Sequence, residues 1–108
     1  MAAKTSDKTG RAVSSLNIDD GRQIVSIAGT RVALESSKNI VNFVIITAET
    51  DNTGIITVGA DTVVASLSTR RGIPLNAGET ISLGGVDLNE VYLDATVSSD
   101  GVTYLYIK

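Results

Sequence analysis

The chain lacks the residue types on which most catalytic and metal-dependent chemistry relies. Its 108 residues include no cysteine and no histidine. Without cysteine there is no disulfide, thiolate nucleophile or thiolate metal site, and without histidine the commonest general base and metal ligand are missing. There is no tryptophan, and the three tyrosines and one phenylalanine leave few aromatic surfaces for stacking sugars or bases. This composition favours binding or assembly over catalysis, and we expect no cofactor.

Charge is also scarce, whereas apolar residues are plentiful. Charged residues make up 19% of the chain, below the roughly 25% typical of globular domains, and 43% are hydrophobic. A small chain of this composition leaves apolar surface exposed as a monomer, so we expect a homo-oligomer. The net charge of −3 disfavours broad attraction to nucleic acid. No apolar run is long enough to span a membrane, and residues 1–7 lack the apolar core of a signal peptide.

Residues 1–22 are expected to form an extended polar arm. Small, polar and charged residues dominate this segment, which cannot bury enough apolar surface to fold alone. It carries four basic and three acidic groups (+1), whereas residues 23–108 carry five and nine (−4). A short helix over residues 11–16 is the less favoured alternative. The candidate interface residues in this arm are Arg11, Val13, Leu16 and Ile18.

Short apolar stretches separated by turn residues predict about eight or nine β-strands in residues 23–108. The longest stretch, residues 40–48, is rich in β-branched residues, which favours a central strand covered on both faces, with Phe43 in the core. A single helical turn is expected at residues 86–90. Further strands are expected at residues 23–27, 31–34, 55–59, 62–66, 73–75, 81–83, 91–97 and 102–107. The fold predicted is an all-β antiparallel sandwich, jelly-roll-like in its winding.

Residues 72–83 contain the only proline of the chain and two short alternating apolar arms. Pro74 has no backbone donor, so its strand is expected at a sheet edge. Residues 76–79 predict a tight turn, in which Gly78 can adopt the positive φ that such a turn often needs. The stretch therefore predicts a hairpin-like corner. Asp100-Gly101 similarly predicts a hairpin loop before the last strand.

No group of residues predicts an active site. A serine or threonine nucleophile would need a lysine or carboxylate as its base, and the four lysines lie in polar or terminal segments. Asp87, Glu90 and Asp94 are close enough in sequence to suggest a glycosidase pair. We favour structural roles for them: Asp87 capping the helical turn, Glu90 solvated, and Asp94 on the outer face of its strand. No catalytic residue is predicted.

Two loops carry the oxygen ligands that calcium prefers. Residues 51–54 and 99–101 contain aspartate and asparagine, but neither loop has the spacing of an EF-hand. Turn-forming side chains explain both loops without a metal. We predict no metal site.

Two pairs of residues in the body are candidate interface residues. Arg70 and Arg71 either contact an acidic partner or form a solvated loop pair. Tyr104 and Tyr106 fall on one face of the last strand, where they belong either to the core or to an interface. The sequence leaves both alternatives open.

Several short motifs of strand and turn residues lie along the chain: Asn52-Thr53-Gly54, Thr57-Val58-Gly59, Gly72-Ile73-Pro74-Leu75, Ala77-Gly78-Glu79, Val91-Tyr92-Leu93-Asp94 and Gly101-Val102-Thr103-Tyr104-Leu105-Tyr106. In these motifs, over roughly residues 30–108, the sequence resembles small structural proteins of tailed bacteriophages, such as capsid decoration proteins and head-fibre bases. The resemblance implies a non-enzymatic β-sandwich that oligomerises on a particle.

From this resemblance we expect a capsid decoration protein, with a trimer favoured, that stabilises the head shell. Its partners would be further copies of itself and the major capsid protein or another virion protein, with no nucleic acid and no membrane. It would be made in the host cytoplasm and located at the capsid surface of the virion. The alternative is an adhesion module of a tail or head fibre that binds host surface glycans.

Overall fold

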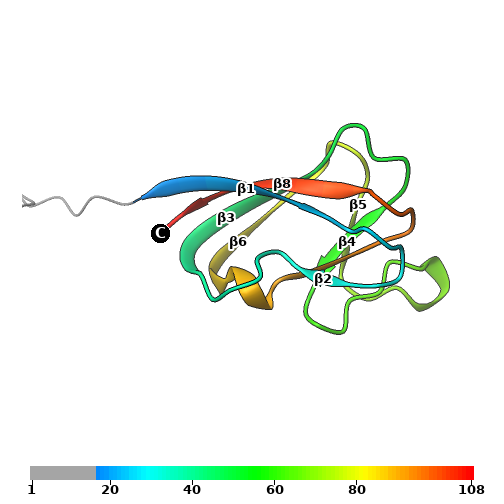
Figure 1. Cartoon of the computed structure of the whole chain (residues 1–108), viewed down its shortest axis with the longest axis horizontal. Coiled ribbons are helices and arrows are strands. Elements are labelled where there is room, and N and C mark those ends of the chain that lie inside the picture. Colours follow the sequence, from blue (N-terminus) through cyan, green and yellow to red (C-terminus); the bar gives the residue numbers. More distant parts are fainter. Residues whose placement is uncertain (1–16) are drawn as a thin grey trace, which may run out of the picture.

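A computed structural model describes residues 17–108 and shows two four-stranded antiparallel sheets packed face to face (Figure 1). The first sheet has the order β1-β8-β3-β6 and the second has the order β2-β7-β4-β5. The strands are β1 (Ile18–Ile24), β2 (Val32–Ala33), β3 (Ile40–Ala48), β4 (Ile56–Gly59), β5 (Ile73–Leu75), β6 (Thr80–Asp87), β7 (Tyr92–Ala95) and β8 (Gly101–Ile107). The expected all-β sandwich is confirmed.

Each strand of the first half pairs with a strand of the second half. The pairs β1–β8, β2–β7, β3–β6 and β4–β5 are all antiparallel, so residues far apart in the sequence become neighbours. Two further pairs, β3–β8 and β4–β7, join these ribbons into the two sheets. Short 3-10 turns, η1 (Leu67–Thr69) and η2 (Leu88–Glu90), complete the regular structure of the described residues. Asp87 caps η2 by accepting a bond from the Asn89 N–H, as predicted.

The expected boundary between arm and sandwich lies too far along the chain. Residues 18–22 belong to β1, which pairs with β8 along its whole length. This strand is at the edge of its sheet and is largely polar, so composition alone does not distinguish it from an arm. Among the expected arm contacts, Ile18 lies in β1, whereas Arg11, Val13 and Leu16 lie outside the described residues.

The turns are placed as predicted, but the two expected hairpins are wrong. Gly78 has a φ of +82°, and the Glu79 N–H donates to the Asn76 carbonyl at 2.9 Å. Pro74 lies on β5, an edge strand, as expected. However, β5 pairs with β4 and β6 pairs with β3, so this corner joins two different sheets. The connection from β7 to β8 likewise crosses between sheets.

Two further strand predictions need correction. Residues 62–66 form no strand and make only an isolated bridge between Val64 and Arg71. β3 is covered on one face rather than two, and Phe43 is 37% exposed on the other face. A continuous apolar run is typical of a strand buried on both faces, but in β3 the side chains that point away from the core lie on the surface of the molecule.

The core lies between the sheets and includes the last strand. Val102, Tyr104 and Tyr106 alternate inward along β8, and all three are buried. The two tyrosine rings stack with centroids 6.1 Å apart. The Tyr104 hydroxyl donates to Glu35 at 2.8 Å, so its polar end is satisfied within the fold. Of the two alternatives for these tyrosines, the structure supports the core, and the interface assignment is wrong.

The two oxygen-rich loops pack against each other. Asp100 is buried, and its carboxylate accepts the backbone N–H groups of Thr53 at 3.0 Å and Gly54 at 2.8 Å. The Asn52 side chain exchanges two hydrogen bonds with the Gly101 backbone, each 2.9 Å long. These bonds join the β3–β4 connection to the β7–β8 connection at the end of the sandwich.

Replacing Asp100 with alanine is expected to lower the free energy of unfolding by about 3 kcal/mol, because two backbone donors lose a charged acceptor. The free energy is measured by urea denaturation. Asp61→Ala removes an exposed aspartate from another loop and serves as the control, with an expected change within about 0.5 kcal/mol. Equal effects of the two substitutions would show that the Asp100 carboxylate does not hold the loops together.

Candidate assembly surface

The register of the first sheet places apolar side chains in two adjacent rows on its outer face. One row runs Ile18, Ile107, Phe43 across β1, β8 and β3. In the next row, Leu105 of β8 is opposite Ile45 of β3. Side chains two residues apart on a strand share a face, so these five residues lie together on the outer side. We call Ile18, Phe43, Ile45, Leu105 and Ile107 the apolar patch.

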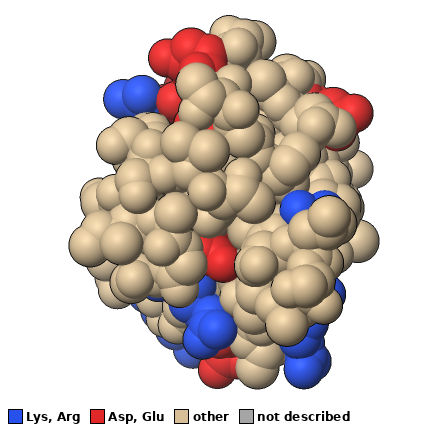
Figure 2. All heavy atoms as spheres, turned by 90° about the vertical axis from the view of Figure 1, so that its right-hand side faces the viewer, with Lys and Arg blue, Asp and Glu red and all other residues tan. Residues whose placement is uncertain are grey.

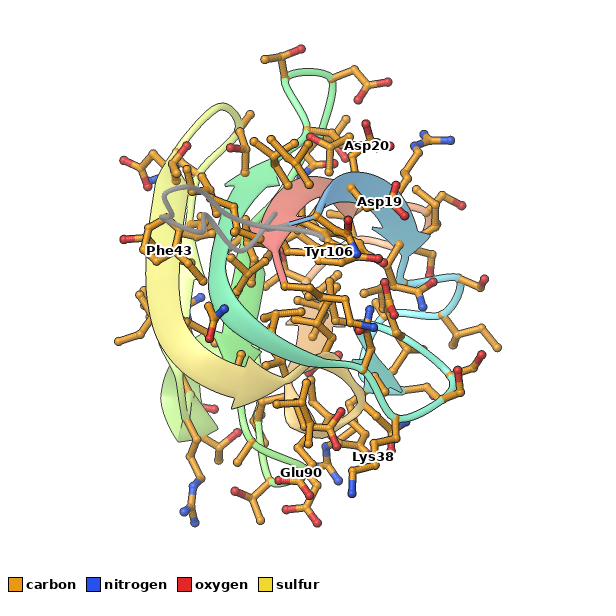
Figure 3. The ribbon with its side chains drawn as sticks, turned by 90° about the vertical axis from the view of Figure 1, so that its left-hand side faces the viewer. Asp19, Asp20, Lys38, Phe43, Glu90 and Tyr106 are labelled. Carbon is orange, nitrogen blue, oxygen red and sulfur yellow. The ribbon has the colours of Figure 1, made fainter. Side chains whose placement is uncertain are left out.

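The apolar patch is open to solvent in the described part of the chain. Ile18 is 65% exposed, Leu105 is 40% exposed and Phe43 is 37% exposed. Figure 3 views this end of the molecule and shows Phe43 on the outer side of the first sheet, whereas Tyr106 points between the sheets. Single exposed apolar residues are common on protein surfaces, whereas here apolar residues of three neighbouring strands form one contiguous group.

The third row of the same face is polar. It contains Arg22, Thr103, Thr47 and Thr80 across the four strands. The Arg22 guanidinium makes two contacts with the Glu49 carboxylate, one of them a 3.0 Å bond from Nη2 to Oε1. The pKa of Arg22 is raised by this hydrogen bond and by the charge of Glu49. The apolar patch therefore has a polar border within its own sheet.

The outer face of the second sheet is covered, in contrast, by a connection of the chain itself. We call residues 60–71 the covering loop. Its side chains Val63 and Ala65 are buried, and so are Thr57 and Asp94 on the sheet beneath. Gly72 allows the close approach, since it has a φ of +110° and a Cβ there would lie 2.6 Å from the Val58 carbonyl oxygen.

Asp94 holds the covering loop against the second sheet. It points to the outer face of β7, as predicted, but it is only 3% exposed. Its Oδ1 accepts the Gly29 N–H at 3.0 Å, and its Oδ2 accepts the Ala65 N–H at 2.8 Å. Arg31 adds a 3.0 Å bond from its Nε to the Val63 carbonyl. Arg70 adds another, of 2.9 Å, to the Ala65 carbonyl.

A hollow of about 390 Å³ opens beside Asp94, between the covering loop and the β1–β2 connection. Figure 2 looks onto this end of the sandwich and shows a largely uncharged surface with acidic atoms in a central recess. Arg31, Ser66 and Leu67 contribute to the walls of the hollow. Both Asp94 oxygens accept backbone N–H groups, so this carboxylate has a structural role at the wall of the hollow.

Two other titratable groups have pKa values shifted by the fold, and both serve structure. The pKa of Tyr104 is raised by burial and by its bond to Glu35, so its hydroxyl remains a donor. The pKa of Asp87 is lowered because its carboxylate accepts the Asn39 N–H at 2.9 Å and the Asn89 N–H at 3.0 Å. Neither residue belongs to the apolar patch.

The structure separates the residues that the sequence proposed as interface candidates. Ile18 lies in the apolar patch, whereas Arg70 and Arg71 lie in the covering loop beside the edge strand β5. The side chain of Arg70 holds that loop, and Arg71 is exposed. Sequence reasoning missed Phe43, Ile45, Leu105 and Ile107 as surface residues. The pairing of β3 with β8 brings these four residues together, and the sequence of either strand alone does not show that pairing.

Comparisons with family models, curated proteins and solved structures found no match to this chain. Within residues 17–108, no three side chains of the types that ligate metals come together. The helical turns of the same residues are too short to cross a membrane. The likeness to phage structural proteins therefore stays a prediction from sequence motifs.

Thr57 lies beneath the covering loop and tests whether water reaches the space between this loop and the second sheet. Its hydroxyl is fully buried and has no hydrogen-bond partner among the described residues. We expect Thr57→Val to raise the free energy of unfolding by about 1 kcal/mol, because it removes an unsatisfied polar group at nearly constant volume. Thr103→Val makes the same change at an exposed site and should have little effect. A loss of stability in Thr57→Val would mean that the hydroxyl is satisfied in solution.

Proposed function

We propose that this protein is a non-enzymatic structural subunit that assembles through the outer face of its first sheet. The observation that carries the proposal is the apolar patch, in which three neighbouring strands present apolar side chains to solvent. A chain whose exposed surface is this apolar gains stability when a partner covers it. The described titratable groups that have shifted pKa values are engaged in structural bonds, which also favours assembly over catalysis.

The particle that we propose is a tailed-phage virion, on which the chain acts as a capsid decoration protein. Support comes from the sequence motifs and from the strand pairing, in which β1 to β4 pair with β8 to β5 in reverse order. Such a ribbon, folded into two sheets, supports a jelly-roll-like winding, which is found in viral capsid and lectin domains. The partners proposed are further copies of the chain, with a trimer favoured, and the major capsid protein.

The glycan-binding alternative receives less support. Sugar recognition relies largely on exposed aromatic rings, and the chain has four aromatic residues, three tyrosines and one phenylalanine. Two of them, Tyr104 and Tyr106, are in the core. The hollow beside Asp94 has no aromatic residue in its walls. We therefore retain the decoration proposal.

Leu105→Lys tests this proposal, because it places a charge in the centre of the apolar patch without entering the core. We expect at least a tenfold loss of affinity for heads of the encoding phage that were assembled without this chain, since about 1.4 kcal/mol gives a factor of ten. Occupancy on the heads is measured by sedimentation and gel densitometry, and oligomeric mass by sedimentation equilibrium.

Thr103→Lys is the matched control, since Thr103 is on the same strand and the same face, one row away in the polar border. It should bind the heads as the unchanged chain does. Equal binding of the two variants would exclude the apolar patch as the contact surface. Failure of the unchanged chain to bind any heads of that phage would contradict the decoration role itself.

A further inference from the structure

We propose that residues 1–16 of a neighbouring copy cover the apolar patch, so that copies are linked by exchanged N-terminal segments. This inference rests on the proposed function, because it names the partner of the same surface. It follows from three properties: the limited size of the patch, the composition of residues 1–16, and the direction in which the chain enters β1.

The apolar patch is too small to hold a rigid partner by itself. Three strands and two rows of side chains span a flat area of about 200 Å², given strand spacings near 4.8 Å and about 7 Å between rows. A stable protein interface buries about 800 Å² on each partner. An extended segment reaches a larger area, because it covers the patch and continues across the sheet. Sixteen residues extend up to about 53 Å, about twice the length of a seven-residue strand.

Residues 1–16 have the composition that such a surface requires. Ala12, Val13 and Leu16 supply apolar side chains just before β1. The segment carries three basic groups and one acidic group (+2), whereas residues 17–108 carry six and eleven (−5). Asp20 of β1 is exposed and is directly opposite Leu105, so an acidic group borders the apolar patch. Attraction between segment and body is therefore expected in addition to apolar contact.

The direction of β1 favours a neighbouring copy over the chain's own face. Asn17 and Lys108 exchange two backbone hydrogen bonds, of 3.3 Å and 2.8 Å, so the chain still runs along β8 at residue 17. To place Val13 on its own outer face, the chain would have to reverse within residues 14–16, Ser-Ser-Leu, which include no glycine or proline. A segment that continued the direction of β1 would carry Val13 about 13 Å beyond Asn17, toward another molecule.

Intermolecular paramagnetic relaxation tests this arrangement directly. The chain has no cysteine, so Ser14→Cys provides a single attachment site for a nitroxide spin label and leaves Val13 and Leu16 unchanged. An excess of spin-labelled chain without isotope is mixed with ¹⁵N-labelled natural chain. We expect a loss of amide signal intensity at Ile45, Leu105 and Ile107, and no loss in the covering loop. Introducing Leu105→Lys into the ¹⁵N chain should abolish the loss.

A second sample distinguishes exchange from folding back within one chain. Here the ¹⁵N chain itself carries the spin label and is diluted into unlabelled natural chain. Signal loss at the patch only in this sample would overturn the exchange, because each segment would then cover its own face. Absence of patch-specific loss in both samples would also overturn it. If the chain binds phage heads but shows no intermolecular loss of amide signal, the proposed function stands and only this inference is contradicted.

Discussion

Two packed sheets have four faces, and residues 17–108 cover three of them. The two inner faces form the core, and the covering loop buries the outer face of the second sheet with Val63 and Ala65. Among residues 17–108, no comparable connection lies above the outer face of the first sheet, which carries the apolar patch. A chain this short has few residues to spare for an additional layer. The apolar patch lies on this uncovered face, and other exposed apolar side chains lie outside it, namely Ile27, Ile40, Leu67, Ile73 and Val97.

Carboxylates hold the connections where the strand ladder does not reach. Asp94 joins two connections over the second sheet, Asp100 joins two at the end of the sandwich, and Asp87 joins two near η2. Each accepts two backbone N–H groups, which would otherwise be left without partners in loops that pack closely. Asp87, Asp94 and Asp100 thus share a structural role, since each of them fixes loops that frame the sheets.

The sequence predicted the elements whose signal is local and missed those decided by pairing. The strand at residues 40–48 and the turn at Gly78 follow from β-branched residues and from backbone freedom, so both were found. Both faces of β3 are apolar, so the sequence does not show which face packs against the other sheet. It therefore does not show that Phe43 lies on the outer face. The polar residues of β1 likewise form a strand because they pair with β8, and the local sequence does not show this pairing. The composition predicted that apolar residues would be exposed, but it did not show where on the surface they lie.

The sheet edges support the proposal that assembly uses the face of the first sheet rather than strand addition. Open edges invite pairing with another chain, and proteins protect them with proline, charge or short strands. In the second sheet, β5 contains Pro74 and β2 has only two residues. In the first sheet, β1 carries three charged residues, and β6 contains Gly84-Gly85, with Gly85 at a φ of +44°. Every edge thus carries a feature that opposes pairing, whereas the apolar patch carries none. This contrast between the protected edges and the open face supports our proposal that the chain assembles through the apolar patch.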